Sequence, residues 1–113
     1  MISTSASQSG IKAAIDVLRV SANNIANINT NNFKKDIASQ RDIKGGGVEV
    51  NVSKSTESGA PIETENGTIE ERSNVNLTEE IVNQIVAENQ VAANAAALKT
   101  GLATDSEILD ILA

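Results

Sequence analysis

Two apolar stripes at helical spacing, one toward each end of the chain, dominate the pattern of hydrophobic and polar positions. The first stripe consists of Ile11, Ile15, Leu18, Ala22 and Ile25. The second consists of Leu77, Ile81, Ile85, Val91, Ala95, Leu98, Leu102, Leu109 and Leu112. Steps of four and three place such side chains along one side of a helix, which is the pattern of a coiled coil. The chain is therefore expected to contain two terminal helices that pack together and need partners.

The first helix is expected from about residue 9 to residue 29. Residues 1 to about 9 are rich in Ser and Thr and are expected to be weakly structured. The polar run 29–33 contains three Asn residues, which tolerate the left-handed conformation at helix ends. This run is therefore expected to end the helix and begin a turn.

The second helix is expected from Asn76 to about Leu112. Asn76 and Glu79 have the spacing of a capping box at its start. Gly101, followed by a second capping box that begins at Thr104, leaves a break in the helix as an alternative. We favour one continuous helix because the apolar stripe keeps its register through this region.

The middle of the chain has a different period. Valines alternate with polar residues over 48–53, after three glycines, and this pattern predicts a half-buried strand. A second short strand is expected near Ile62 or over 68–71, after the turn pair Asn66-Gly67. An isolated hairpin is only marginally stable, so we expect one small hairpin that packs on a helix.

The predicted fold class is mainly α, an antiparallel coiled coil of the N- and C-terminal helices with a small β-hairpin insertion. It forms one structural domain in three parts. These parts are 1–35 (helix and turn), 36–72 (linker with hairpin) and 73–113 (helix).

Composition supports a thin structure. The 113 residues are 40% hydrophobic, yet Phe33 is the only aromatic residue. Since aromatic side chains supply much of the area in globular cores, helix-on-helix packing of aliphatic residues fits better than a thick core. The net charge of -6 disfavours binding to nucleic acid. No apolar run approaches the length that spans a bilayer, and the start lacks the pattern of a secretory signal.

The residue types give little support for catalysis. The sequence contains no Cys and no His, which removes thiol nucleophiles, imidazole bases and the usual zinc ligands. The carboxylates are scattered, and the three consecutive glycines lack the ending of a phosphate-binding loop. We therefore expect no catalytic residues, no cofactor, no metal site and no enzyme activity.

Two longer motifs carry a family resemblance. Residues 21–34 read SANNIANINTNNFK and resemble the N-terminal signature of the bacterial flagellar rod and hook family. Asn31-Asn32 stand where that family usually has Pro-Gly, and Asn can adopt similar turn geometry. Residues 73–85 read SNVNLTEEIVNQI and are similar to the opening of the family's C-terminal helix. The chain thus resembles a short rod-type member with both terminal signatures.

The resemblance implies a structural subunit of the bacterial flagellar basal-body rod. Such subunits assemble through their terminal helices into a tubular axial structure. The implied partners are other copies of the chain, other flagellar axial proteins and the flagellar type III export apparatus, without nucleic acid or membrane insertion. The implied location is the periplasm-spanning rod, reached without a cleaved signal peptide.

The expected helix and assembly contacts are Ile11, Ile15, Leu18, Ile25, Leu77, Ile81, Ile85, Val91, Leu98, Leu102 and Leu109. The signature residues are Asn23, Asn24, Asn27, Thr30 and Phe33. The four polar signature residues are expected to make polar contacts or end the helix, and Phe33 to anchor the turn. The alternative function is a cytoplasmic coiled-coil adaptor or chaperone that binds a partner helix without polymerising.

Overall fold

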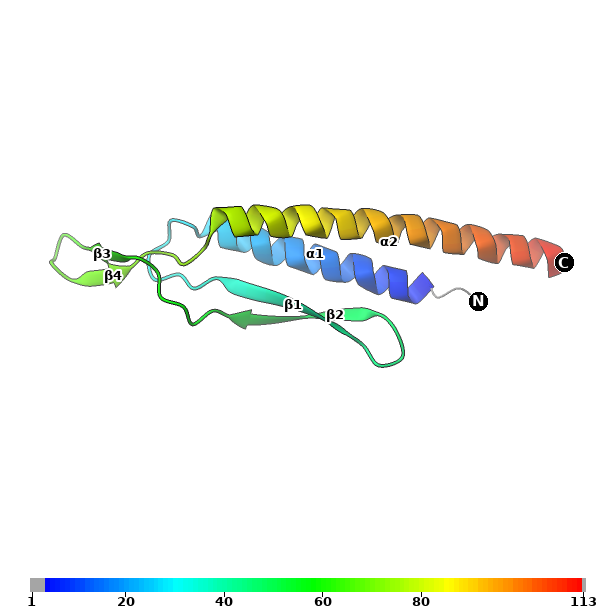
Figure 1. Cartoon of the computed structure of the whole chain (residues 1–113), viewed down its shortest axis with the longest axis horizontal. Helices are drawn as coiled ribbons and strands as arrows, with labels where there is room; N and C mark the ends of the chain where they lie inside the picture. The colour runs from blue at the N-terminus through cyan, green and yellow to red at the C-terminus, as the bar shows by residue number, and fades with distance from the viewer. Residues whose placement is uncertain (1–3, 113) are drawn as a thin grey trace.

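The computed structural model describes residues 4–112 as an elongated body with extents of 77 × 24 × 14 Å. Helices α1 (Thr4–Ala26) and α2 (Leu77–Leu112) lie side by side and run in opposite directions (Figure 1). Two antiparallel hairpins lie between them in sequence. They are formed by β1 (Asp36–Asp42) with β2 (Val48–Lys54), and by β3 (Pro61–Glu63) with β4 (Ile69–Glu71). The mainly α class with a β insertion is confirmed.

Helix α1 begins earlier and ends earlier than the sequence pattern predicts. It starts at Thr4 rather than near residue 9, so the expectation of a weakly structured start was wrong for residues 4–9, while residues 1–3 lie outside the described chain. Propensity is a weak guide here because α1 packs along α2 and gains stability from that contact. After Ala26 the chain turns, and Thr30 N donates to Asn27 O at 3.1 Å.

Helix α2 is continuous through Gly101, as favoured from the sequence. Asn76 caps its start, because Asn76 Oδ1 accepts a hydrogen bond from Glu79 N at 3.2 Å. The Glu79 carboxylate lies 3.5 Å from Lys35 Nζ, so this side chain joins α2 to the segment before β1.

The hairpins differ from the expected one. The strand over 48–53 exists as β2, but its partner is β1 rather than a segment near Ile62 or over 68–71. Those two segments instead pair with each other across the Asn66-Gly67 turn, as β3 and β4. The β1 sequence, DIASQRD, has no strong strand pattern of its own. It becomes a strand because β2 lies beside it and both pack on α1.

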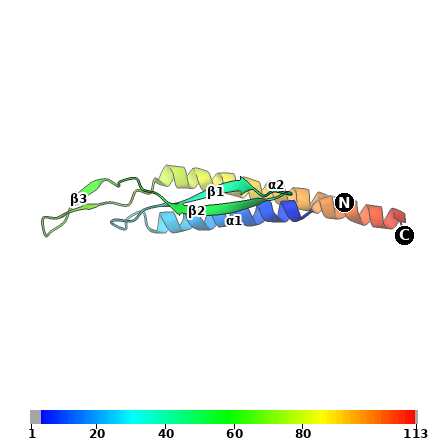
Figure 2. The same ribbon diagram turned by 90° about the horizontal axis from the view of Figure 1, so that it is seen from below.

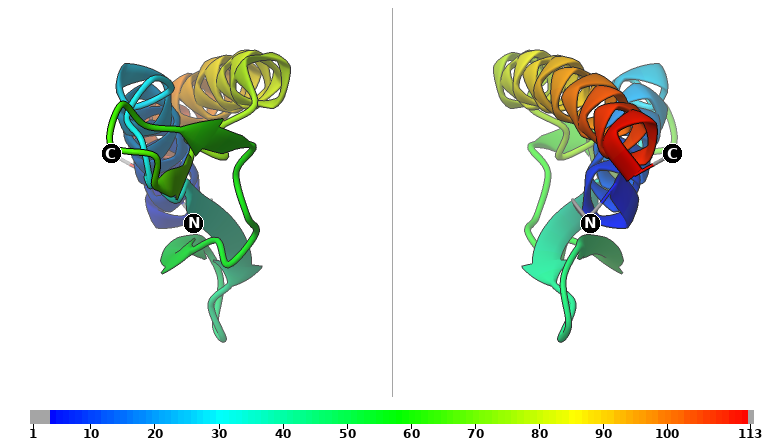
Figure 3. Two further views of the ribbon diagram at one scale, coloured as in Figure 1. Left: turned by 90° about the vertical axis from the view of Figure 1, so that its left-hand side faces the viewer. Right: turned by 90° about the vertical axis from the view of Figure 1, so that its right-hand side faces the viewer.

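The β1–β2 hairpin and α2 lie against different sides of α1. Figure 2 shows this hairpin against α1, and Figure 3 shows α1, α2 and the hairpin as three neighbours seen end-on. Val48 N donates to Ser9 Oγ of α1 at 3.1 Å, and Gln40 Nε2 of β1 donates to Gln90 Oε1 of α2 at 2.9 Å. These contacts fix which side of each helix faces the hairpin.

The β3–β4 hairpin extends beyond the end of the helix pair (Figure 1). It is tied back by Asn32, whose φ of 64° is the left-handed conformation that Asn tolerates better than most residues. Asn32 N donates to Glu71 O at 2.7 Å, and Asn32 Oδ1 accepts from Glu71 N at 3.2 Å. Lys34 also bonds the Glu71 carboxylate through its ammonium group.

The hydrogen bond from Lys34 lowers the pKa of Glu71 below its ordinary value of 4.5, against a smaller opposing effect of burial. Because the pKa is lower in the folded protein, the ionised Glu71 carboxylate stabilises the fold at pH values above the ordinary pKa. This stabilisation is lost as the pH falls through the folded-state pKa. We expect Lys34→Met to raise the pKa of Glu71, measured by NMR titration of its carboxyl carbon. Lys44→Met, at the tip of the other hairpin, should leave this pKa unchanged; an equal rise in both variants would contradict the assignment.

Candidate assembly surface

The seam between α1 and α2 is made of small and polar residues. Its buried members are Ala14, Ser21 and Asn24 of α1 and Glu80, Ala87 and Gly101 of α2, whereas the buried Ala13 lies on the side of α1 that faces β2. Ala14 and Ala87 are both 0% exposed. Gly10 approaches Asn94 so closely that a Cβ at Gly10 would lie 2.6 Å from Asn94 Oδ1. Small side chains thus allow the two helix backbones to come close together.

The large apolar residues of the predicted stripes lie beside or outside this seam. Ile15, Leu77, Ile81, Ile85, Leu102 and Leu109 are between 44% and 62% exposed. Ile11, Leu18, Ile25, Val91 and Leu98 are half-buried. The expected roles of these residues in helix contacts within and between chains stay predictions. The closest approach falls on the neighbouring row of smaller residues, which permits a shorter distance between the helices.

The stripe residues of both helices share one face of the helix pair. The contacts of Ser9 and Gln90 place the β1–β2 hairpin on one side, and the seam residues mark the line between the helices. With 3.6 residues per turn, the stripes then fall on the side away from the hairpin. We call this surface the open face. It comprises Ile11, Ile15, Leu18, Ala22 and Ile25 of α1 and Leu77, Ile81, Val91, Leu98 and Leu102 of α2, with Ile85 at its outer edge, on the side of α2 away from α1.

Helix α2 is apolar on further sides as well. Val82 and Val86 are 51% and 50% exposed and widen the apolar surface around the helix, with Val82 beside Ile85 and Val86 farther round. Over 91–97 the helix is mostly Ala around its whole circumference. A helix that is apolar all round is typical of one covered by neighbours on several sides. Within this chain, α1 covers only one side of it.

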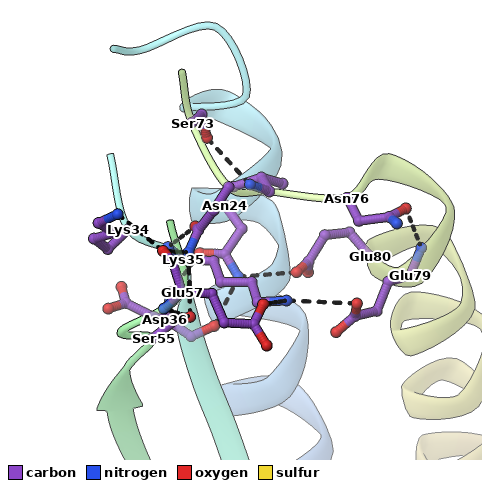
Figure 4. Close-up of polar contacts among 12 residues, drawn as sticks. Asn24, Lys34, Lys35, Asp36, Ser55, Glu57, Ser73, Asn76, Glu79 and Glu80 are labelled. Carbon is purple, nitrogen blue, oxygen red and sulfur yellow. Dashed lines mark hydrogen bonds and ion pairs between the residues drawn. The ribbon is translucent and has the colours of Figure 1, made fainter. Parts of the chain in front are cut away.

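A polar cluster fixes the pairing of the helices near the start of α2 (Figure 4). Asn24 is 1% exposed and uses its whole amide. Its Nδ2 donates to Glu80 Oε1 at 3.0 Å and to Asp36 O at 2.8 Å, and its Oδ1 accepts from Asp36 N at 2.9 Å. One side chain thereby joins α1, α2 and β1.

Glu80 is the buried acidic member of this cluster, at 3% exposure. Its carboxylate receives the Asn24 amide, and its backbone carbonyl accepts from Ser21 Oγ at 3.0 Å. A buried charge needs such partners, so this pair favours one register of α1 along α2 over others.

Lys35 is the buried basic member, at 9% exposure. Its Nζ lies 3.5 Å from Glu79 Oε2 and 3.9 Å from Glu57 Oε2. Its backbone N donates to Asn74 Oδ1 at 2.7 Å, and its carbonyl accepts from Ser55 N at 2.9 Å. The cluster therefore also holds the two segments that connect the hairpins to the helices.

The other signature residues surround the exit of α1. Asn23 Nδ2 donates to Asp36 Oδ2 at 3.4 Å, Asn27 Nδ2 to Asn23 O at 2.9 Å, and Thr30 Oγ1 to Asn27 Oδ1 at 3.1 Å. The half-buried Phe33 ring has Lys54 Nζ 5.6 Å from its centroid. Phe33 thus contacts the end of β2, and its role as an anchor of the turn stays a prediction.

Among the buried residues of the seam and of the polar cluster, the sequence pattern had indicated only Asn24. A signal for the seam was present, because Glu80, Ala87, Asn94 and Gly101 follow one another at intervals of seven. That row is less conspicuous than the stripe of Ile and Leu because it contains no large apolar residue. The burial of Lys35 had no comparable signal, since its partners come from three separate segments.

Within residues 4–112, no group of three His, Cys, Asp or Glu side chains could hold a metal ion. The same part of the chain has no helix with the length and apolar character needed to cross a bilayer.

The comparison with known families agrees with this architecture. Residues 66–111, which span β4 and nearly all of α2, match the family described as flagellar basal body rod FlgEFG protein C-terminal. This match supports the resemblance of the chain to the flagellar rod and hook family. No curated protein matches the chain significantly. The match suggests a structural role in the basal-body rod, and the matched family is not a family of enzymes.

Proposed function

We propose that the chain is a structural subunit of the flagellar basal-body rod that assembles through α1 and α2 into a tubular axial structure. The observation that carries this proposal is the open face, together with the apolar circumference of α2. In an assembled tube, neighbouring helices would cover these surfaces in coiled-coil fashion. The two helices would then form the inner wall, with the hairpins outside them.

The energetics favour assembly. Full burial of a Leu or Ile side chain contributes about 1.5–3 kcal/mol. Since Ile81, Ile85 and Leu102 each keep about half of their surface exposed, contact with neighbours would add roughly 1 kcal/mol for each. Large exposed apolar patches of this kind mark interaction surfaces.

The shape of the chain favours head-to-tail contacts. One end carries the β3–β4 hairpin and the other the end of α2, so the two ends differ (Figure 1). Contacts between unlike surfaces that do not close into a ring produce helical filaments. The proposed partners are other copies of the chain, other flagellar axial proteins and the flagellar type III export apparatus.

Aspartate substitutions on the open face test this proposal. We expect Leu18→Asp and Ile85→Asp to abolish swimming and the recovery of the chain with isolated basal bodies, because a buried unpaired carboxylate is costly. Circular dichroism of the purified variants should show retained helix, at least for the more exposed Ile85.

Ile69→Asp is the matched control, because Ile69 is 77% exposed and lies on β4, away from both helices. It should leave swimming unchanged. Normal swimming in both open-face variants would contradict the assembly role. Wild-type chain that remains with soluble cytoplasmic proteins would favour the adaptor function instead.

A further inference from the structure

The last part of α2 extends beyond the start of α1. We call residues 102–112 the overhang; it projects past α1 in both long views (Figures 1 and 2). Its apolar side chains are open to solvent, with Ile111 at 82%, Leu112 at 77% and Leu109 at 62% exposure. The helix continues here with most of its side chains exposed.

The overhang continues the side of α2 that faces α1, but its residues change in size. Along this side the positions at intervals of seven are Glu80, Ala87, Asn94, Gly101 and Ile108. Beside α1, the last two residues of this row are Asn94 and Gly101. Beyond α1 the next residue of the row is the larger Ile108, and Leu109 and Leu112 lie beside it. The side of α2 that contacts α1 therefore extends into a larger apolar surface that is exposed.

The charge of the overhang indicates which surface of a second copy it can contact. Asp105, Glu107 and Asp110 make the overhang acidic, with no basic residue. The β3–β4 hairpin is also acidic, since 61–71 contain four Glu and no Lys or Arg. End-to-end contact between overhang and hairpin is thus repulsive.

Helix α1 has the opposite balance. It alone among the described helices and strands has more basic than acidic residues, with Lys12 and Arg19 against Asp16. Lys12 and Arg19 are exposed and lie along the border of the apolar stripe that contains Ile15. Arg19 Nη1 also bonds Asp16 Oδ1 at 3.2 Å, and its side chain remains 74% exposed.

Asp105 places one of the three acidic charges on the side of the overhang that continues the seam. It lies between Leu102 and Leu109 and is half-buried. A carboxylate on this side favours a partner surface that offers Lys or Arg as donors.

We propose that the overhang of one copy packs on the open side of α1 of a second copy, with its acidic residues beside Lys12 and Arg19. This inference rests on the self-assembly proposed above and names the contact that carries it. It makes α1 the shared element, which binds its own α2 at the seam and the α2 of a neighbour on its open side.

Disulfide trapping tests the contact, because the natural sequence contains no Cys. Full-length Leu109→Cys and Ile15→Cys variants are mixed, concentrated and treated with a mild oxidant. We expect a covalent dimer of the two variants, at about ten times the yield from a mixture of Leu109→Cys with Ile69→Cys, since a disulfide requires Cα atoms within about 7 Å. All three sites are exposed, and circular dichroism verifies that the variants fold.

Charge reversal provides an independent readout of the same pair. Asp105→Lys should lower the yield of the covalent dimer several-fold, and the double change Lys12→Glu with Arg19→Glu on the other variant should restore it. Restoration would support the contact, and a yield unaffected by either change would overturn the role of charge in it.

The outcomes separate this inference from the proposed function. Light scattering that shows assembly, with equal yields from both Cys mixtures, would overturn the overhang contact and leave assembly intact. A wild-type chain that neither scatters as an assembly nor is recovered with basal bodies would overturn both.

Discussion

Asn24→Ala is expected to lower the free energy of unfolding by roughly 3–5 kcal/mol, because each buried group left without its hydrogen bond costs about 1–3 kcal/mol, and a charged group costs more. Asn24 is 1% exposed and makes three hydrogen bonds, one of them to the carboxylate of Glu80. Alanine removes all three and leaves Glu80, at 3% exposure, without the amide that faces it. Urea unfolding followed by circular dichroism measures the loss.

Asn23→Ala is the matched control for this substitution. Asn23 is the preceding residue of the same helix, is exposed, and makes one longer side-chain bond of 3.4 Å to Asp36. Its loss should cost less than about 1 kcal/mol, as for other surface polar contacts. Equal losses in the two variants would show that Asn24 has no special place in the pairing of the helices.

Ala87→Leu is expected to separate the helices and to cost at least about 1–3 kcal/mol, the range for overpacked cores. Ala87 is 0% exposed in the seam, and Ala14 of α1 is also 0% exposed. Three additional carbon atoms would have to fit between the helices or enter the small cavity that Ala87 borders with Val17, so we expect the register or the spacing of the helices to change. Urea unfolding measures the cost, and loss of the Asn24–Glu80 contact by NMR would report the separation.

Ala96→Leu is the control for the size of the side chain. Ala96 belongs to the same helix but is exposed, and Leu and Ala have similar helix propensities. This variant should unfold within about 0.5 kcal/mol of the wild type. If Ala87→Leu behaved in the same way, the seam would not be closely packed.

Asn24 and Ala87 show why the sequence pattern did not identify the seam. The search for large apolar residues at steps of four and three found Ile11, Ile15 and Leu18, which the structure places on the open face or beside the seam. The seam itself uses the adjacent row of Ala, Ser and Asn, because close approach of two backbones requires small side chains. Periodicity identifies the helix, but it does not identify which of two rows faces the nearer partner.

The middle segment shows the same difference between local patterns and tertiary contacts. Alternating valines predicted β2, and the pair Asn66-Gly67 predicted the turn between β3 and β4, because both signals are local. β1 was missed because its sequence has no strand pattern and gains its conformation from pairing with β2. The choice of partner is a tertiary property that strand propensity does not encode.

The sequence alone determined the features that depend on neighbouring residues. These are the two helices, the Asn76 cap, the continuity of α2 through Gly101 and the motifs that carry the family. Only the tertiary structure decided which residues are buried, because burial depends on elements far apart in sequence. It placed Asn24, Lys35 and Glu80 in one polar cluster and left the large apolar stripes outside the seam. The physical reason is that the small row allows the closest contact within one chain, so the large residues remain to be covered from outside.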